Sequence, residues 1–266
     1  MRLILHRDAR CVAVDKPSGV ATHRGWADDD DALLQRVRDE VGAYVYPVNR
    51  LDRGASGIVL FALDREAARA FAEAWDGAEK TYLAITRGHP PEALVIDHAI
   101  PRAPGEERVP AVTEIRRLEA FGRYALVEAR PRTGRLHQIR RHLKHISCPI
   151  IGDVRYGKGE HNRIFRTQHG LHRLALHATA LTVAHPEGGV LRVACPLAAE
   201  LDAALASCRA AYGDGGRRDG NDSNRHGAER HDDQDSSRHN GERHDSQDSE
   251  RRDDGNSRDD GTARDG

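Results

Sequence analysis

The chain has 266 residues, and its 41 Lys and Arg nearly balance its 42 Asp and Glu, for a formal net charge of −1. Its four cysteines are scattered without a Cys-x-x-Cys pair, and no apolar run approaches about 18 residues, the length of a membrane-spanning helix. These features argue against a disulfide-rich secreted domain and against a membrane protein. We therefore expect a cytoplasmic protein that does not bind a membrane.

The composition changes abruptly after Tyr212. The segment 213–266 contains no Leu, Ile, Val, Phe, Tyr, Trp, Met or Cys, and it carries 10 Arg against 16 Asp and Glu. It has too little apolar surface to offset the entropy of ordering, so we predict a disordered, low-complexity charged tail. Because the tail's net charge is −6 and the whole chain's is −1, the remaining domain, 1–212, carries about +5. A basic domain of this kind favours a polyanionic partner.

Hydrophobic patterning predicts the elements of this domain in chain order. Apolar residues at helical spacing predict helices at 31–41, 65–75 and 136–145, the last with Leu136, Ile139 and Leu143 on one face. Alternating or continuous apolar runs predict strands at 2–6, 11–15, 57–62, 80–86, 112–118, 124–129, 174–183 and 190–194. The glycine-rich stretch 150–165 is predicted to be a loop. Without a regular βαβ rhythm, this pattern predicts an α+β fold with a mixed, largely antiparallel sheet flanked by helices.

One carboxylate stands between two arginines in the stretch NRLDRGASGIVLFA, residues 49–62. Asp52 lies between Arg50 and Arg53, directly before a glycine-bracketed turn and an apolar run. Glycines permit backbone conformations that suit a loop presenting a side chain into a cleft. An ionised carboxylate at such a place is a candidate nucleophile or base. A structural ion pair is the alternative that these residues alone leave open.

A second stretch, RTGRLHQIRRHLKH at 132–145, concentrates positive charge. Its five cations are typical of a phosphate-binding surface, although a solvated polar helix face is the alternative. Its three histidines have no spacing typical of a metal site, so we predict none. Upstream, Lys80-Thr81-Tyr82 opens a predicted strand, where the tyrosine is either ordinary packing or an aromatic platform for a nucleobase.

The order of these pieces resembles the RluA-type pseudouridine synthases from Val12 to about Pro196. The carboxylate loop is followed by Lys-x-Tyr, then by Arg-Thr-Gly-Arg-x-His-Gln-Ile-Arg, then by Ile-Gly-Asp-x-x-Tyr-Gly. The family's pattern around the acid is His-Arg-Leu-Asp-Arg-x-Thr-Ser-Gly. Here Asn49 replaces the histidine and Ala55 replaces the threonine, which puts the hydrogen bonding of the loop in question. The resemblance implies the pseudouridine synthase fold, with a central RNA-binding catalytic cleft in residues 1–212.

The resemblance also implies roles for individual residues. Asp52 would attack the target uridine or its ribose, Arg140 would pair with that carboxylate, and Tyr82 would stack on the base. Arg50 would take the place of a base flipped out of the RNA stack. No metal and no organic cofactor is implied, and we expect a monomer. The predicted RNA contacts are Arg50, Arg53, Lys80, Arg132, Arg135, His137, Gln138, Arg141 and Lys144.

A narrower resemblance concerns the substrate. The runs HQIRRHLKHISCPIIGD and KGEHNRIFRTQHGLHRLALHA resemble the branch of the family that modifies uridine 65 in tRNA. The segment before Val12 is too short for an accessory RNA-binding domain, so we expect the catalytic domain to position the RNA itself. A ribosomal-RNA synthase of the same family is the alternative. A non-catalytic RNA-binding protein on the same fold is the alternative of another class.

Overall fold

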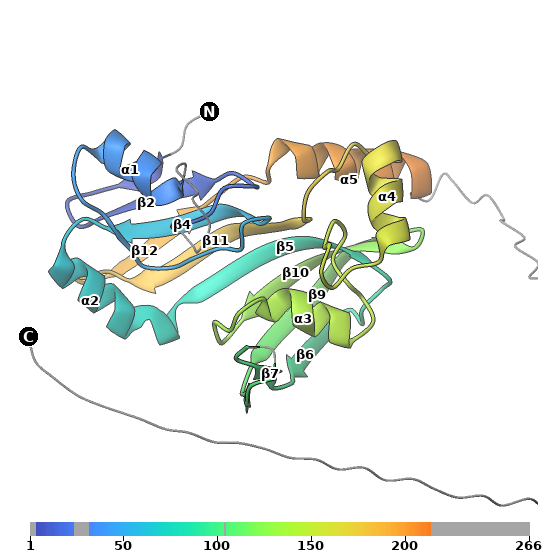
Figure 1. The fold of residues 1–266 in the computed structure, drawn as a ribbon, viewed down its shortest axis with the longest axis horizontal. Helices are drawn as coiled ribbons and strands as arrows, with labels where there is room; N and C mark the ends of the chain where they lie inside the picture. Colours follow the sequence, from blue (N-terminus) through green and yellow to red (C-terminus); the bar gives the residue numbers. More distant parts are fainter. Residues whose placement is uncertain (1–3, 24–31, 104, 214–266) are drawn as a thin grey trace, which may run out of the picture. The chain divides into compact units, whose positions relative to one another are not determined.

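The computed structural model describes residues 4–23, 32–103 and 105–213 (Figure 1). The predicted tail therefore lies outside the described residues, apart from Gly213. The start of the predicted strand at 2–6 and residue 31 of the first predicted helix lie outside them as well. No helix within the described ranges is long and apolar enough to cross a membrane.

One mixed sheet of ten strands forms the centre of the fold. Its main path runs β1-β2-β4-β11-β5-β10-β9-β6, while β3 pairs with β4 and β12 pairs with β11. All these pairs are antiparallel except β4 with β11, so the prediction of a mixed, largely antiparallel sheet is confirmed. The strands are β1 Ile4–Arg7, β2 Cys11–Lys16, β3 Tyr46–Pro47, β4 Ser56–Ala62, β5 Glu79–Arg87, β6 Ala93–Asp97, β9 Val112–Phe121, β10 Tyr124–Pro131, β11 Leu176–Ala184 and β12 Val190–Ala194. A separate small ribbon pairs β7 Ile100–Pro101 with β8 Arg108–Val109.

Helices cover both faces of this sheet (Figure 1). One face holds the larger core, which receives side chains from four helices. The opposite face holds a smaller core, in which α2 packs on β2, β4, β11 and β12. The helices of the larger core are α1 Leu33–Val41, α3 Gln138–His145, α4 Gly159–Gln168 and α5 Ala199–Tyr212, while α2 spans Arg65–Ala74 and a single 3₁₀ turn, η1, spans Trp75–Gly77.

Residues 49–55, which carry Asp52 and are called the acidic loop below, are followed by an apolar run that forms β4. This strand is buried along its whole length. Val59 and Phe61 pack into the larger core, and Ile58 and Leu60 pack into the smaller one. Alternate side chains of a strand point to opposite faces, so a strand covered on both sides needs apolar residues throughout. This is why the run at 57–62 is continuous and not alternating.

Gly57 holds β4 against β11. Its φ is +106°, and a Cβ there would lie 2.1 Å from the carbonyl oxygen of Ala178. Only glycine combines this backbone conformation with so close an approach. The contact fixes the end of the acidic loop next to the centre of the sheet.

Several element predictions are corrected by the structure. The helix α4 begins within the segment 150–165 that was predicted as a loop, and its residues Phe165 and His161 pack against Tyr124 of β10. The helix predicted at 136–145 begins only at Gln138, and Leu136 is 39% exposed and does not join its apolar face. The five-residue strand β6 and the fourteen-residue helix α5 have no counterpart among the predictions.

Candidate active site

A cleft with a volume of about 390 Å³ opens above β5, between the acidic loop and the turn that precedes α3. The acidic loop supplies Asn49–Asp52 and Ala55 to its wall, and the turn supplies Thr133–His137. Lys80 and Tyr82 of β5 line the cleft between these two walls. Polar and aromatic side chains from three distant parts of the sequence therefore meet in one place.

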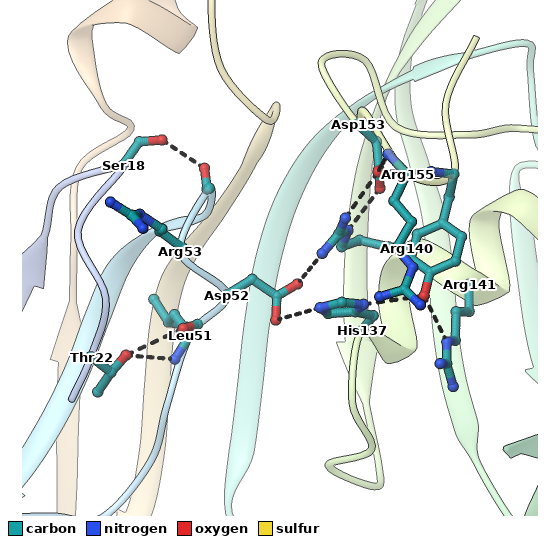
Figure 2. Close-up of polar contacts among 12 residues, drawn as sticks. Ser18, Thr22, Leu51, Asp52, Arg53, His137, Arg140, Arg141, Asp153 and Arg155 are labelled. Atoms are coloured by element: carbon teal, nitrogen blue, oxygen red, sulfur yellow. Dashed lines mark hydrogen bonds and ion pairs between the residues drawn. The ribbon is translucent and has the colours of Figure 1, made fainter. Parts of the chain in front are cut away.

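The acidic loop is anchored by the turn that follows β2. The hydroxyl of Ser18 donates to the carbonyl of Gly54 at 2.7 Å, and Thr22 exchanges hydrogen bonds with the backbone of Leu51 at 3.2 Å (Figure 2). Lys16 is fully buried, and its Nζ donates to the carbonyls of Pro17, Val20 and Arg53. Burial lowers the pKa of Lys16 to about 7. The segment 16–22 thus holds the backbone on both sides of Asp52.

Asp52 points out of this loop towards α3 (Figure 2). Its Oδ2 accepts a hydrogen bond from Nη1 of Arg140 at 2.9 Å, and its Oδ1 lies 3.8 Å from Nε2 of His137. The neighbouring Arg53 donates from Nε to the carbonyl of Gly19 at 2.8 Å, and its side chain points away from Asp52 (Figure 2). The cation that holds Asp52 is therefore distant in sequence, as the family resemblance implies.

Arg140 is shared between two carboxylates. Its Nε and Nη2 donate to the two oxygens of Asp153 at 2.7 and 2.9 Å, which leaves Nη1 for Asp52. Asp153 is completely buried, and its Oδ1 also accepts from the backbone N–H groups of Arg155 and Tyr156. Burial alone would raise the pKa of Asp153, but the Arg140 guanidinium and these N–H donors hold it below its ordinary value. A bidentate pair of this kind fixes the plane of the guanidinium.

The turn before α3 is built around the buried side chain of Gln138. Its Oε1 accepts from the Thr133 hydroxyl and the Arg135 backbone N–H. Its Nε2 donates to the Val112 carbonyl and the Thr113 hydroxyl, both at 2.9 Å. All four hydrogen-bonding positions of the amide are used within the protein. Gln138 is thus a brace for the cleft wall, and its predicted RNA contact stays a prediction.

His137 precedes α3 in a left-handed backbone conformation, with φ of 56°. This conformation takes its ring out of the helix and into the cleft, where Nδ1 lies 3.1 Å from the Tyr156 hydroxyl. This backbone conformation is strained by about 1–2 kcal/mol at a residue other than glycine. The sequence pattern gave no indication of this, because it predicts a helix through residue 137.

Tyr82 lies on β5 between two small neighbours. Its register partners are Ala129 on β10 and Ala178 on β11. Small flanking side chains leave the ring accessible from the cleft that it lines. Burial, together with the nearby Asp52 carboxylate, raises the pKa of Tyr82 to about 12. Its hydroxyl is therefore protonated at neutral pH, which suits an aromatic platform and not a phenolate base.

The remaining predicted RNA contacts divide into two groups. Arg50, Lys80 and Arg135 line the cleft, and Arg50 is exposed with no hydrogen bond or ion pair among residues 4–23, 32–103 and 105–213. The other three, Arg132, Arg141 and Lys144, do not line the cleft. Arg132 pairs with Glu114, Arg141 donates to the Tyr156 hydroxyl and the Pro101 carbonyl, and Lys144 is an exposed residue of α3 outside the cleft lining.

Both departures from the family pattern fit the loop. Asn49 lies beside β4, where its Oδ1 accepts from the Leu60 N–H at 2.8 Å and its Nδ2 faces the Ile58 carbonyl at 3.4 Å. Ala55 is buried, and its N–H donates to the carbonyl of Asp52 at 3.0 Å. Neither replacement leaves the described part of the acidic loop without support.

The three histidines of the basic stretch have separate partners. His137 faces Asp52, while buried His142 bonds to the Thr113 hydroxyl and the His98 carbonyl. His145 stacks on the ring of His98 with centroids 3.7 Å apart. Their rings therefore do not converge on a common point.

Sequence reasoning missed four residues that shape the site. Lys16 and Asp153 are buried polar anchors, and Tyr156 contacts His137 and Arg141. Trp75 lines the cleft, with the Lys80 ammonium 5.3 Å from its ring centroid. The Ile-Gly-Asp-x-x-Tyr-Gly motif contained Asp153 and Tyr156, and was the only signal that could have singled them out.

Comparison with known proteins agrees with this arrangement. The sequence profile described as RNA pseudouridylate synthase matches residues 10–145. The structure of human RNA pseudouridylate synthase domain containing 4 superposes with a TM-score of 0.65 at 28% identity, covering 77% of this chain and 92% of that one. The human domain-containing 1 protein gives 0.64 at 26% identity, covering 77% and 87%.

Curated bacterial relatives are more similar in sequence. A protein of Pectobacterium carotovorum named tRNA pseudouridine synthase C is 41% identical over 70% of this chain, which spans only 56% of that protein. Proteins of the same name from Vibrio parahaemolyticus and Haemophilus ducreyi are 39% and 38% identical over 69% of this chain, and 85% and 86% of their own lengths are covered. With a matched profile over half of its length and relatives well above 30% identity, the chain belongs to the RNA pseudouridylate synthase family.

Proposed function

We propose that this chain converts a uridine of tRNA, at position 65, into pseudouridine, with Asp52 as the nucleophile. The observation that carries the proposal is the placement of Asp52. Its carboxylate faces a cleft, is held by Arg140 at 2.9 Å, and shares that cleft with the ring of Tyr82. The tRNA substrate is supported by the relatives named tRNA pseudouridine synthase C at 38–41% identity.

The reaction is an isomerisation within one nucleotide. The bond between N1 of uracil and C1′ of ribose breaks, and a bond between C5 and C1′ forms. C5 loses its proton and N1 gains one, so the atoms of substrate and product balance. A base inside a helix is out of reach of such a cleft, so the uridine must be flipped out. Tyr82 would stack on the flipped base, and exposed Arg50 would fill the gap that it leaves in the RNA.

The cleft suits an RNA partner on electrostatic grounds. Arg50, Lys80 and Arg135 line it without a carboxylate partner among the described contacts. Proteins read structured RNA through its shape, phosphates and stacking, for which cations next to an aromatic floor are appropriate. Each phosphate neutralised makes the affinity more dependent on salt.

The test of the catalytic assignment is Asp52→Asn. An amide cannot act as the nucleophile, so release of tritium from C5-labelled uridine in a tRNA transcript should fall to background. RNA affinity should stay within a few-fold, because the exchange removes only a charge that repels phosphate. Asp202→Asn, at an exposed position of α5, is the matched control and should keep full activity. Turnover by purified Asp52→Asn would refute the assignment.

The substrate is tested by competition. A full tRNA transcript carrying uridine 65 should be modified in preference to 23S rRNA fragments and to a short isolated stem-loop. Equal modification of the 23S fragments would transfer the chain to a ribosomal branch of the family and leave the role of Asp52 intact. Binding without tritium release by the wild type would instead indicate a non-catalytic RNA-binding protein.

A further inference from the structure

Three side chains form a chain of contacts that ends at Asp52 (Figure 2). Nε of Arg141 donates to the hydroxyl oxygen of Tyr156 at 3.0 Å, and that hydroxyl lies 3.1 Å from Nδ1 of His137. On the other side of the same ring, Nε2 of His137 lies 3.8 Å from Oδ1 of Asp52. The proposed role of Asp52 leaves this chain of contacts without a function.

The donor inventory fixes the direction of the first hydrogen bond, and the tautomer of His137 sets the direction of the second. A guanidinium has no acceptor, so the Tyr156 oxygen must accept from Arg141. The phenolic proton of Tyr156 is then free to be donated to Nδ1 of His137. A neutral imidazole that accepts at Nδ1 carries its own proton on Nε2. In this tautomer the proton of His137 points at Asp52.

The groups around His137 favour its neutral form. Burial lowers the pKa of His137, and the cations of Arg140, Arg155 and Arg141 add to this effect, whereas the Asp52 carboxylate opposes it. A neutral ring with one defined tautomer is a directional donor. A charged ring would carry a proton on both nitrogens and would lose its hydrogen bond from Tyr156.

The backbone at His137 and the side chain of Arg141 are both held in place by hydrogen bonds. His137 has φ of 56°, and the buried amide of Gln138 braces the turn that holds it there. Arg141 is itself anchored, since its Nη1 donates to the carbonyl of Pro101 at 2.6 Å. Strained backbone at non-glycine residues persists where the surroundings fix it, and it clusters at functional sites.

We propose that Tyr156 is a positioning residue, which fixes His137 as the Nε2–H tautomer and so directs a proton donor at Oδ1 of Asp52. Arg140 holds Oδ2 from one side and His137 faces Oδ1 from another, so the two donors limit rotation of the carboxylate. This inference rests on the proposed role of Asp52 as nucleophile. It assigns His137 to the orientation of the carboxylate, where the sequence predicted an RNA contact.

The first test is spectroscopic and needs no activity. In the full-length wild type labelled with ¹⁵N-histidine, the ring signals of His137 are identified by their absence in His137→Gln. Their shifts should report protonated Nε2 and unprotonated Nδ1 at neutral pH. Tyr156→Phe, which loses only the hydroxyl, should give a mixture of tautomers. Tyr44→Phe, at a 62% exposed tyrosine, is the matched control and should leave the signals unchanged.

The second test is a double-mutant cycle. Tyr156→Phe should lower kcat about tenfold, the scale of one lost hydrogen bond, and should leave KM for the tRNA transcript nearly unchanged. The amide N–H of a glutamine can replace the Nε2–H of His137 without needing an acceptor at Nδ1. In the His137→Gln background, the Tyr156→Phe substitution should therefore cost less than twofold.

Two results would overturn the inference: an Nδ1–H tautomer of His137 in the wild type, or an equal loss of kcat from Tyr156→Phe in both backgrounds. Failure of the proposed function looks different. Turnover by Asp52→Asn would refute the assignment of Asp52 as nucleophile, whereas the tautomer of His137 reported by the spectra would be unaffected.

Discussion

Replacing Arg140 with methionine removes the cation that two carboxylates share. Arg140 makes three charge-assisted hydrogen bonds, at 2.7 and 2.9 Å to Asp153 and at 2.9 Å to Asp52. Its side chain is 10% exposed, and those of Asp153 and Asp52 are 0% and 19% exposed, so water can replace little of what is lost. Removing one partner of a buried ion pair costs about 3–5 kcal/mol. We expect a loss of this size in the free energy of unfolding at pH 7.5, together with loss of activity.

The loss should depend on pH with a defined sign. In the wild type the pKa of Asp153 is held below its ordinary value of 3.8, so its ionisation stabilises the fold above that pH and ceases to do so as the pH falls through the folded pKa. In Arg140→Met the same carboxyl is buried without a cation, and its charge opposes folding. Protonation relieves this penalty. The difference between wild type and variant is therefore largest near pH 7.5 and shrinks below about pH 5.

Urea unfolding at pH 7.5, 5.0 and 4.0 measures this difference. Arg117→Met is the matched control, because this partly buried arginine donates to the carbonyl of Pro90 and not to a carboxylate. Its loss of stability should not change with pH. Adding Asp153→Asn to Arg140→Met removes the orphaned charge and should restore part of the stability. A pH-independent loss in Arg140→Met, or no restoration by Asp153→Asn, would refute the reasoning.

Three further predictions concern other parts of the chain. Burial lowers the pKa of Lys16 from 10.5 to about 7, so between these pH values the unfolded state binds one more proton and wild-type stability should rise with pH. In thermal unfolding, Lys16→Met should lack this rise, and an equally steep rise in the variant would contradict the assignment. Arg50→Gln should weaken tRNA binding without shifting the melting temperature, as filter binding and thermal unfolding would show, because Arg50 is exposed at the cleft; an unchanged affinity would exclude the predicted RNA contact. Deleting 214–266 should leave the melting temperature unchanged, since that segment has no large apolar side chain able to join a core, and a drop of several degrees would indicate docking.

Apolar patterning in the sequence predicts which segments are buried and whether one or two of their faces are covered. The continuous run at 57–62 predicted a buried strand, which is found as β4, and the alternation at 80–86 and the apolar residues at 124–129 predicted strands found within β5 and β10. Burial on one or two faces leaves its period in the sequence, so these elements are readable without tertiary information. Apolar residues also recur at helical spacing at Leu201, Leu205 and Cys208. The helix that they form, α5, was not among the predicted elements.

The local sequence could not decide α4 or the start of α3. The segment 159–168 is mostly polar, and its Phe165 packs on Tyr124 of β10. At residue 137 the helical period continues, but the hydrogen bonds of Gln138 to β9 break the helix there. In both places contacts with distant strands override local propensity.

The partners within the site were decided only by the tertiary structure. Asp52 stands between two arginines in the sequence, yet its cation is Arg140, 88 residues away, and that arginine is itself held by buried Asp153. The family resemblance supplied the first of these pairs, and nothing in the sequence pattern supplied the second. Periodicity records whether a side chain is buried, whereas a hydrogen bond depends on the position and direction of two groups, which only the packed sheet and its turns bring together.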